Sequence, residues 1–220
     1  MKARRVDACQ ELLRRYEANG EAFLQHIVMG DESWVHFYEP GQKRQSMEWR
    51  HTSFPKPKKV RVQRSAGKVM LTFFWDYNGP ILEHYMPRAS TVTSDTYSNL
   101  LRENLKPALR QKRRGLLTGG MSPLHDNVKP HTATATVSTI EELWFECIPH
   151  PTYSPDLVPS DFHVFAPLKD ALSGDDDEVQ SVVHEWLRTR PKEFFSRGIY
   201  VLVKCWRKCI ELEGDYAEQQ

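Results

Sequence analysis

The feature that most constrains the fold of this chain is the position of three aspartates relative to its predicted strands and helices. Asp31 lies in IVMGDESW, within or just after the first predicted strand. Asp126 ends a short predicted strand in PLHDNVKPHTA, and Asp161 lies in the first turn of a predicted helix in YSPDLVPSDFHVF. Three carboxylates on three different elements can converge on one point only in a fold that brings those elements together.

Aspartates in this arrangement predict a metal-dependent site. Hard divalent cations such as Mg²⁺ and Mn²⁺ prefer oxygen ligands, and phosphodiester chemistry commonly uses two such ions about 3.5–4 Å apart. A single aspartate is more often a helix cap or a surface charge. We give that plainer interpretation to five other aspartates: Asp7, Asp76, Asp95, Asp156 and Asp215.

The order of predicted elements is β-β-β-α-β-α-β-α, preceded by one helix and followed by others. Residues 5–18 form an amphipathic pattern that stops at Asn19-Gly20. KVMLTFFWDYNG and PILEHYMPR predict a hairpin that turns at Asn78-Gly79, and Ser94 is the expected N-cap of the helix after it. FECIPH predicts a further strand before the segment that carries Asp161.

A long basic segment lies between the first two predicted strands. Residues 39–66 lack periodicity, and from Gly41 to Lys68 the chain has nine Lys or Arg and one Glu. Segments of this length are usually functional or mobile, and a local positive excess attracts polyanions. A disordered basic loop with a solvated surface is the alternative.

Composition adds little about partners. The formal net charge is +1, so the whole chain does not announce a nucleic-acid ligand. The four cysteines form no CxxC pair and predict buried free thiols, which fit a reducing compartment. We find no signal peptide and no apolar run long enough to span a membrane, and expect an intracellular protein.

The three motifs, with 34 residues between Asp126 and Asp161, resemble those of the mariner family of DNA transposases, in the Tc1/mariner superfamily. The resemblance runs from about Arg4 to about Tyr216. It implies an RNase H-like α/β fold: a mixed five-stranded sheet, three strands antiparallel and two parallel, flanked by helices and interrupted by the long basic loop.

The resemblance also implies a function and its residues. Asp31, Asp126 and Asp161 become the catalytic ligands of two Mg²⁺ or Mn²⁺ ions, which serve DNA strand cleavage and then strand transfer. The expected partners are transposon ends and target DNA, bound by a homodimer in the nucleus, with no membrane and no small-molecule substrate. The inserted loop becomes a dimer clamp, with Trp49 and Phe54 as its aromatic anchors.

Further residues are expected near DNA. Those of the inserted loop are Lys56, Lys58, Lys59, Arg61 and Arg64. Asn127, Lys129 and His131 follow the second aspartate and could touch phosphate or orient the loop. Alternatively, Asn127 and His131 only satisfy backbone groups at the turn between strand and helix.

Three segments are predicted. Residues 1–26 form a helical lead-in, 27–172 the catalytic core with 39–66 as its inserted loop, and 173–220 a set of C-terminal helices that pack on the core. The family carries two helix-turn-helix modules ahead of its catalytic domain, and nothing in these 220 residues resembles them. Recognition of terminal repeats is therefore not expected from this sequence.

Two departures from the family pattern concern activity. Ser122 and Pro123 occupy a strand that is usually apolar, and proline is disfavoured in a central strand because it cannot donate to the ladder. The stretch from Leu172 to Asp175 is also shorter than usual. These departures keep two alternatives open. One is a host-retained domain that dimerises or binds DNA with little catalysis, as in fusions of a histone methyltransferase with a mariner domain. The other is a plain structure-specific nuclease.

Overall fold

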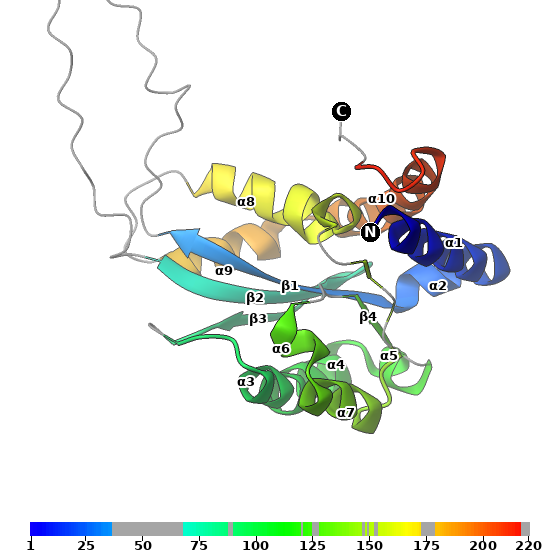
Figure 1. The fold of residues 1–220 in the computed structure, drawn as a ribbon. Helices are drawn as coiled ribbons and strands as arrows, with labels where there is room; N and C mark the ends of the chain where they lie inside the picture. The colour runs from blue at the N-terminus through cyan, green and yellow to red at the C-terminus, as the bar shows by residue number, and fades with distance from the viewer. Residues whose placement is uncertain are drawn as a thin grey trace, which may run out of the picture.

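A computed structural model of the chain describes residues 1–36, 68–87, 90–119, 121–124, 128–146, 148, 150–151, 154–172 and 179–216. A mixed β-sheet lies between two layers of helices (Figure 1). In the part of the chain that is described, no helix is both long and apolar enough to cross a membrane.

Four strands form the sheet, in the order β3-β2-β1-β4. They are β1 (Ile27–His36), β2 (Lys68–Asp76), β3 (Gly79–Tyr85) and β4 (Ser122–Leu124). β1 pairs antiparallel with β2 and parallel with β4, while β2 and β3 form the predicted hairpin. The mixed sheet flanked by helices is the predicted RNase H-like architecture.

The fifth expected strand is not assigned as a strand, but its described residues bond to β4. Glu146 N donates to Met121 O at 2.9 Å, and Ile148 N donates to Pro123 O at 3.2 Å. These two bonds advance by two residues on each side, as in a parallel ladder. Cys147 and Pro149 fall outside the described residues, so the regular part of the sheet ends at β4.

The same bonds explain how β4 accommodates its proline. In a strand, the N–H and C=O of one residue point to the same side. The carbonyl of Pro123 points toward Ile148, so its missing N–H also faces away from β1. The pairing of β4 with β1, in which Val28 lies opposite Pro123, uses the neighbouring residues and stays intact.

Helices cover both faces of the sheet (Figure 1). One layer, which we call the lower layer, contains α3 (Ser94–Asn99), η1 (Leu100–Leu105), α4 (Lys106–Lys112), α5 (Arg114–Gly119), α6 (Lys129–Thr132) and α7 (Thr134–Glu142). The other, the upper layer, contains α1 (Lys2–Asn19), α2 (Glu21–His26), η2 (Pro155–Leu157), η3 (Ser160–Phe165), α8 (Ala166–Ala171), α9 (Val179–Thr189) and α10 (Lys192–Glu211).

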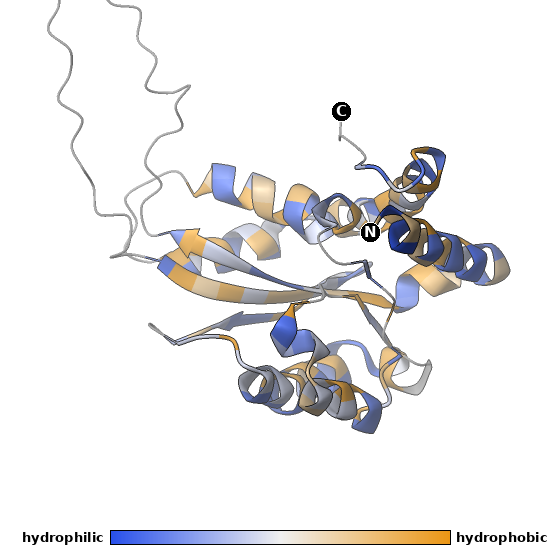
Figure 2. Cartoon of the chain, in the orientation of Figure 1, coloured by the Kyte–Doolittle hydropathy of each residue, from blue (hydrophilic) through white to orange (hydrophobic). Residues whose placement is uncertain are grey.

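Each layer packs its own core against the sheet. Met29, Phe73 and Trp75 belong to the core beneath the upper layer, whereas Val28 and Phe74 belong to the core of the lower layer. Consecutive strand residues thus point to opposite faces, as the pleat requires. Figure 2 shows largely orange strands between helices banded in orange and blue, the pattern of amphipathic helices on an apolar sheet.

The hairpin turns one residue earlier than predicted. Asp76 pairs with Gly79, so Tyr77 and Asn78 form the turn, and Gly79 has a φ of 118° that favours glycine. Asp76 is fully buried, and its carboxylate accepts hydrogen bonds from Asn78 N at 2.8 Å and from Arg113 Nε at 2.7 Å. It is therefore neither a helix cap nor a surface charge, and our plainer interpretation of Asp76 was wrong.

Two helices of the fold contain a wider, π-helical turn, and in both a proline follows two residues later. η1 precedes Pro107, and η3 precedes Pro167. A proline lacks the N–H that bonds the carbonyl four residues back, and its ring crowds that carbonyl. The chain instead makes five-residue bonds: Lys106 N donates to Leu101 O, and Ala166 N donates to Asp161 O. The first of these helices is capped by Thr93 rather than by the predicted Ser94.

Three of the four cysteines are confirmed as buried free thiols. Cys9 on α1 and Cys205 and Cys209 on α10 lie where these two helices pack together. Burial raises the pKa of Cys205 to about 11 and also raises the pKa of Cys9. The Cys9 and Cys205 thiols are therefore poor nucleophiles at neutral pH. Cys147 lies outside the described residues.

We predict that Pro123→Val changes the free energy of unfolding by less than about 1 kcal/mol. The new N–H gains a bond worth about 0.5–1.5 kcal/mol on the side away from β1, and the greater freedom of the unfolded chain offsets about 0.4–1 kcal/mol of it. Denaturant unfolding followed by tryptophan fluorescence measures the change. A gain of several kcal/mol would show instead that the proline strains the strand.

Candidate active site

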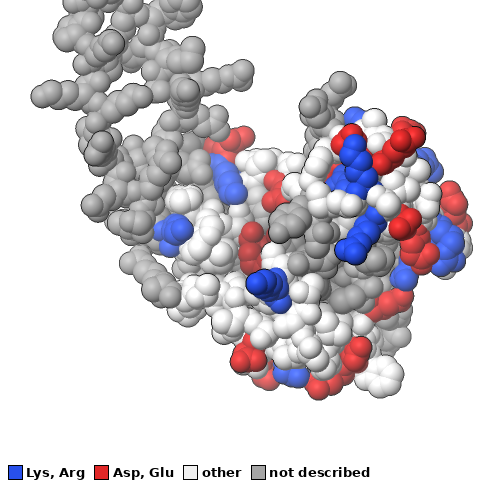
Figure 3. Space-filling model, in the orientation of Figure 1, with Lys and Arg blue, Asp and Glu red and all other residues white. Residues whose placement is uncertain are grey.

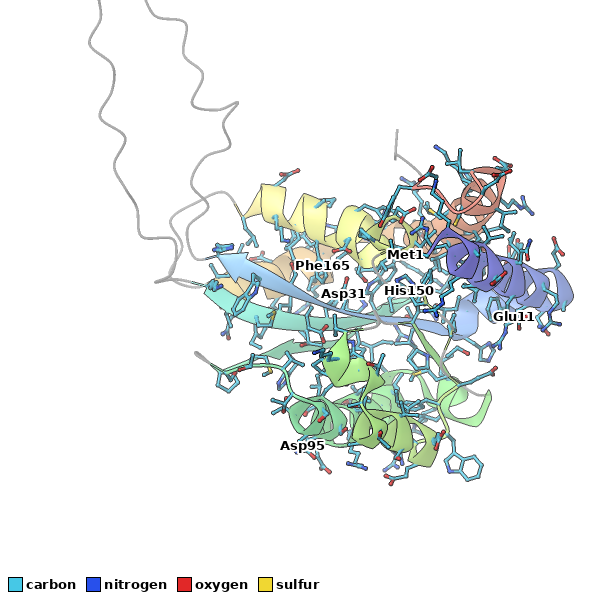
Figure 4. The ribbon with its side chains drawn as sticks, in the orientation of Figure 1. Met1, Glu11, Asp31, Asp95, His150 and Phe165 are labelled. Carbon is cyan, nitrogen blue, oxygen red and sulfur yellow. The ribbon has the colours of Figure 1, made fainter. Side chains whose placement is uncertain are left out.

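Asp31 lies on the central strand and faces the upper layer. It pairs with Phe73 of β2 and alternates with Met29 and Val35, which belong to the core beneath the upper layer. Its Oδ1 accepts a hydrogen bond from Glu32 N at 2.8 Å. Figure 4 shows Asp31 on the side of the sheet toward α8, with Phe165 of η3 close by. The residue before it, Gly30, leaves room for the ring of Phe74, which a Cβ would meet at 2.6 Å.

Asp161 lies on η3, which packs against β1 from the upper layer. It occupies the first turn of its helix, as predicted, and its side chain is exposed. The π-helical turn begins at the residue before it, and such turns occur frequently at functional sites. Pro167 accounts for the turn, so a proline six residues later shapes the backbone that carries this aspartate.

The polar residues around Asp161 bind other parts of the protein. Trp75 Nε1 of β2 donates to Ser160 Oγ at 3.1 Å, and Ser160 is fully buried. His163 donates from Nε2 to Phe194 O at 2.6 Å and stacks on the Phe194 ring with centroids 4.4 Å apart. Burial lowers the pKa of His163, although the Phe194 carbonyl acts in the opposite direction. η3 is thus tied to β2 on one side and to α10 on the other.

A close approach of α10 supports this arrangement. A Cβ at Gly198 would meet His163 Cδ2 at 2.6 Å and Trp75 Cη2 at 2.9 Å. Only a residue without a side chain lets α10 reach the two rings that hold η3. The position of Asp161 therefore depends on contacts that reach both the sheet and the last long helix.

The second predicted ligand cannot be placed. Asp126 and Asn127 lie outside the described residues, as do Trp49, Phe54 and the basic residues of 39–66 (Lys56, Lys58, Lys59, Arg61 and Arg64). The described part of the strand before Asp126 does run parallel to β1, with Leu124 opposite Met29. The roles of Asp126, Asn127 and the named residues of 39–66 therefore remain predictions.

Lys129 and His131, which follow on α6, differ in exposure. Lys129 is exposed, whereas His131 is buried beneath the lower layer. The imidazole packs against the Tyr97 ring, with centroids 4.0 Å apart and an interplanar angle of 37°, and its Nε2 lies 3.5 Å from Glu32 Oε1. A buried side chain does not reach a phosphate from this position. Of the roles considered for His131, its burial favours orienting the turn. Glu32 points away from Asp31, as strand alternation predicts.

The residues in view fit a divalent cation as oxygen donors. Asp31 and Asp161 belong to elements in contact, with Asp31 on the face of β1 toward the upper layer and Asp161 on η3 in that layer. Within the described ranges, no group of three or more His, Cys, Asp or Glu converges, and the predicted third carboxylate is outside them. The described surface in Figure 3 mixes acidic and basic residues, most densely over α1 and α10, in keeping with the net charge of +1.

One buried residue of this region escaped the sequence analysis. Arg5 on α1 pairs with Asp156 of η2, and their side chains are only 1% and 8% exposed. Asp156, expected to be a helix cap or a surface charge, forms a buried ion pair. The signal was present: Arg5, Cys9 and Leu12 follow the spacing of one buried helix face.

Comparisons with known proteins agree with this geometry. Residues 39–118 match the family model "Transposase (partial DDE domain)". The Mariner Mos1 transposase of Drosophila mauritiana is 38% identical over 98% of this chain, and the match covers 62% of that protein. The histone-lysine N-methyltransferase SETMAR of Homo sapiens is 32% identical over 98% of this chain and 31% of its own length. The chain thus spans less than two thirds of these relatives.

Solved structures give the same picture. The catalytic domain of Mos1 mariner transposase superposes with a TM-score of 0.80 and 35% identity, covering 99% of this chain and 95% of that one. The Mos1 mariner paired end complex with Mn superposes with a TM-score of 0.87 and 37% identity, covering 99% of this chain and 63% of that one.

We predict that Ser160→Ala lowers the free energy of unfolding by about 1–3 kcal/mol, because Trp75 Nε1 loses its acceptor in a buried place. Denaturant unfolding measures the loss. In a Trp75→Phe background the donor is already gone, so the same substitution should cost clearly less. Equal costs in the two backgrounds would mean that the hydrogen bond does not couple η3 to β2.

Proposed function

Because the chain belongs to the mariner family of transposases and spans the catalytic domain of that family, we propose that it is a metal-dependent DNA nuclease and polynucleotidyl transferase. The observation that carries this proposal is the contact of β1 with η3: Asp31 lies on the face of β1 toward the upper layer, and Asp161 lies on η3 in that layer. Asp126, which follows β4, is proposed as the third ligand.

The residues of the site would hold two Mg²⁺ or Mn²⁺ ions. Mos1 structures that contain Mn or Mg support this choice of metals. When bound, such a pair activates the attacking oxygen, stabilises the leaving oxygen and balances the charge of the carboxylates. The chain itself would hold the carboxylates in place. Asp31 lies on a strand paired on both sides, and Asp161 lies on a helical turn tied to β2 and α10.

The same site would serve two reactions. In strand cleavage a water molecule attacks the phosphorus, and in strand transfer a freed 3′-hydroxyl attacks it instead. Both are in-line displacements, so only the nucleophile differs. Lys129, which is exposed on α6, could bind a DNA phosphate beside the site.

The partners are proposed from the relatives. Solved Mos1 structures include a paired end complex and a strand transfer complex. By analogy we propose transposon ends and target DNA as the substrates, a homodimer clamped by the 39–66 segment as the active form, and the nucleus as the place of action.

A second candidate is a host-retained domain that binds DNA with little catalysis, favoured by the 32% identity with SETMAR. In that fused form the resemblance implies a changed third acidic ligand, whereas this chain keeps Asp161. The second candidate predicts DNA binding without metal-dependent cleavage. A plain nuclease, the third alternative, would cleave but would not join ends.

We predict that Asp161→Ala and Asp31→Ala each lower Mn²⁺-dependent plasmid nicking by more than about 100-fold, since even outer partners of metal ligands contribute about 10–100-fold. Asp95→Ala is the matched control, because Asp95 is exposed on the outer side of the lower layer (Figure 4). It should nick as the unaltered protein does. Joining of a labelled 3′-end to target DNA, measured on the same samples, separates a transposase from a plain nuclease.

Equal traces of nicking in all four proteins would contradict the catalytic proposal and favour the host-retained domain. A DNA-binding assay on the same proteins then tests that alternative directly. Loss of nicking in Asp95→Ala would point to misfolding rather than to loss of a ligand, and circular dichroism of each variant checks for it.

A further inference from the structure

The guanidinium of Arg5 is buried and makes several hydrogen bonds to distant parts of the chain. Its Nη1 and Nη2 donate to the two carboxylate oxygens of Asp156 at 3.0 and 2.6 Å. Nη1 also donates to Ser154 Oγ at 2.5 Å, and Nε donates to Gly214 O at 2.9 Å. The Tyr216 ring lies 4.6 Å from the guanidinium carbon. Two distant stretches of the chain, 154–156 and 214–216, therefore contact this one side chain of α1.

Arg5 keeps its charge in this buried place. Burial acts to lower the pKa of the guanidinium, but the hydrogen bonds and charge of Asp156 outweigh it and raise the pKa above its ordinary value. A charged pair that is nearly inaccessible to water is costly to form and costly to break, so its geometry is strongly determined. The bidentate arrangement also fixes the orientation of Asp156.

From Asp156 the backbone leads directly to the third predicted ligand. Leu157 N donates to Ser154 O at 3.0 Å and Val158 N to Pro155 O at 3.1 Å, which closes the η2 turn. Asp161 N then donates to Val158 O at 3.2 Å. A continuous set of short-range hydrogen bonds thus joins the residues that Arg5 holds to the aspartate itself.

The packing of this turn gives it little room to shift. Leu157 and Val158 are 2% and 4% exposed and belong to the core beneath the upper layer. Ser160, the next polar residue, is bound to Trp75. The start of η3 is therefore held at two points, by Arg5 before the turn and by Trp75 after it.

We propose that Arg5 is a positioning residue for the active site: through Asp156 and Ser154 it fixes the η2 turn and thereby the place of Asp161. The metal-binding part of this inference rests on the proposed function. Arg5 lies on α1, within the predicted lead-in of residues 1–26, so this helix belongs to the machinery that sets the site.

The alternative is that the pair only stabilises the fold. The chain offers a control in a second ion pair on the opposite face of the sheet, between Asp76, which is fully buried, and Arg113, whose side chain is 19% exposed. Arg113 Nε and Nη2 bind the two oxygens of Asp76 at 2.7 and 3.1 Å. Breaking this pair should destabilise the protein from the face of β2 opposite the one on which Trp75 binds η3.

The experiment compares Arg5→Met and Asp156→Asn with Arg113→Met at a temperature where all are folded. Amide hydrogen exchange of residues 158–165 is measured by mass spectrometry, and Mn²⁺ affinity by calorimetric titration. We expect faster exchange in this segment and about 10-fold weaker Mn²⁺ binding, the lower end of what outer partners of a ligand contribute, in the first two variants. In Arg113→Met, the exchange rates of residues 158–165 and the Mn²⁺ affinity should both stay within about 2-fold of those of the unaltered protein.

The Arg5→Met/Asp156→Asn double variant adds a test of coupling. If the two residues act as one unit, the double variant binds Mn²⁺ about 10-fold more weakly than the unaltered protein, as each single variant does; additive losses would make it about 100-fold weaker than the unaltered protein. Additive losses would overturn the proposal that the pair is the positioning element.

Unchanged exchange at 158–165 in Arg5→Met would overturn the proposal whatever the metal does. Equal changes in Arg113→Met would also overturn it, because they would trace to general destabilisation. If neither the unaltered protein nor Asp161→Ala binds Mn²⁺, the proposed function fails and the metal-binding part of the inference falls with it. The exchange result still decides separately whether Arg5 positions the turn.

Discussion

The pairing of β1 on both of its edges is the constraint on which the rest of the structure depends. β1 is bonded antiparallel to β2 and parallel to β4, so its register is fixed from two sides. A shift by one residue would move every side chain of a strand to the opposite face. In the observed register Asp31 faces η3, while its neighbour Glu32 faces His131 in the other layer. Strand alternation alone therefore separates Asp31, the proposed metal ligand, from Glu32, which packs near His131.

Most polar residues of the segment from Ser154 to His163 bind other parts of the protein, and one is exposed. Ser154 and Asp156 bind Arg5, Ser160 binds Trp75, and His163 binds the backbone of Phe194. Asp161 is the exposed member of the series. A metal ligand must be held to within a fraction of an ångström, and about 1 Å of displacement can cost on the order of 10²-fold in rate. The dense support around one exposed aspartate fits that demand.

Much of this architecture follows from local patterns. The helix over residues 5–18, the hairpin and the helix that begins near Asp161 depend on periodicity and on turn residues, and all three were predicted from the sequence. The alternation of β1 also placed Glu32 on the face away from Asp31. The Asn78-Gly79 turn was predicted one residue late, because Gly79 pairs as the first residue of β3.

Features set by distant contacts could not be predicted in the same way. Asp156 looks like a cap until Arg5, 151 residues earlier, is known to lie beside it. Asp76 looks like a surface charge until Arg113 covers it. His131 looks available for DNA until Tyr97 and Glu32 enclose it. The π-helical turns have a local signal in the prolines that follow them, but a proline alone does not tell whether a helix widens, bends or ends. The roles of Asp126 and of the basic segment stay predictions.

The contact between Arg5 and the carbonyl of Gly214 spans 209 residues. The guanidinium therefore finds its partners only when α1 lies against the residues that follow α10. Removal of residues 214–216 would leave Arg5 Nε without this acceptor in a buried place, so a change at one end of the described chain would be felt at the other.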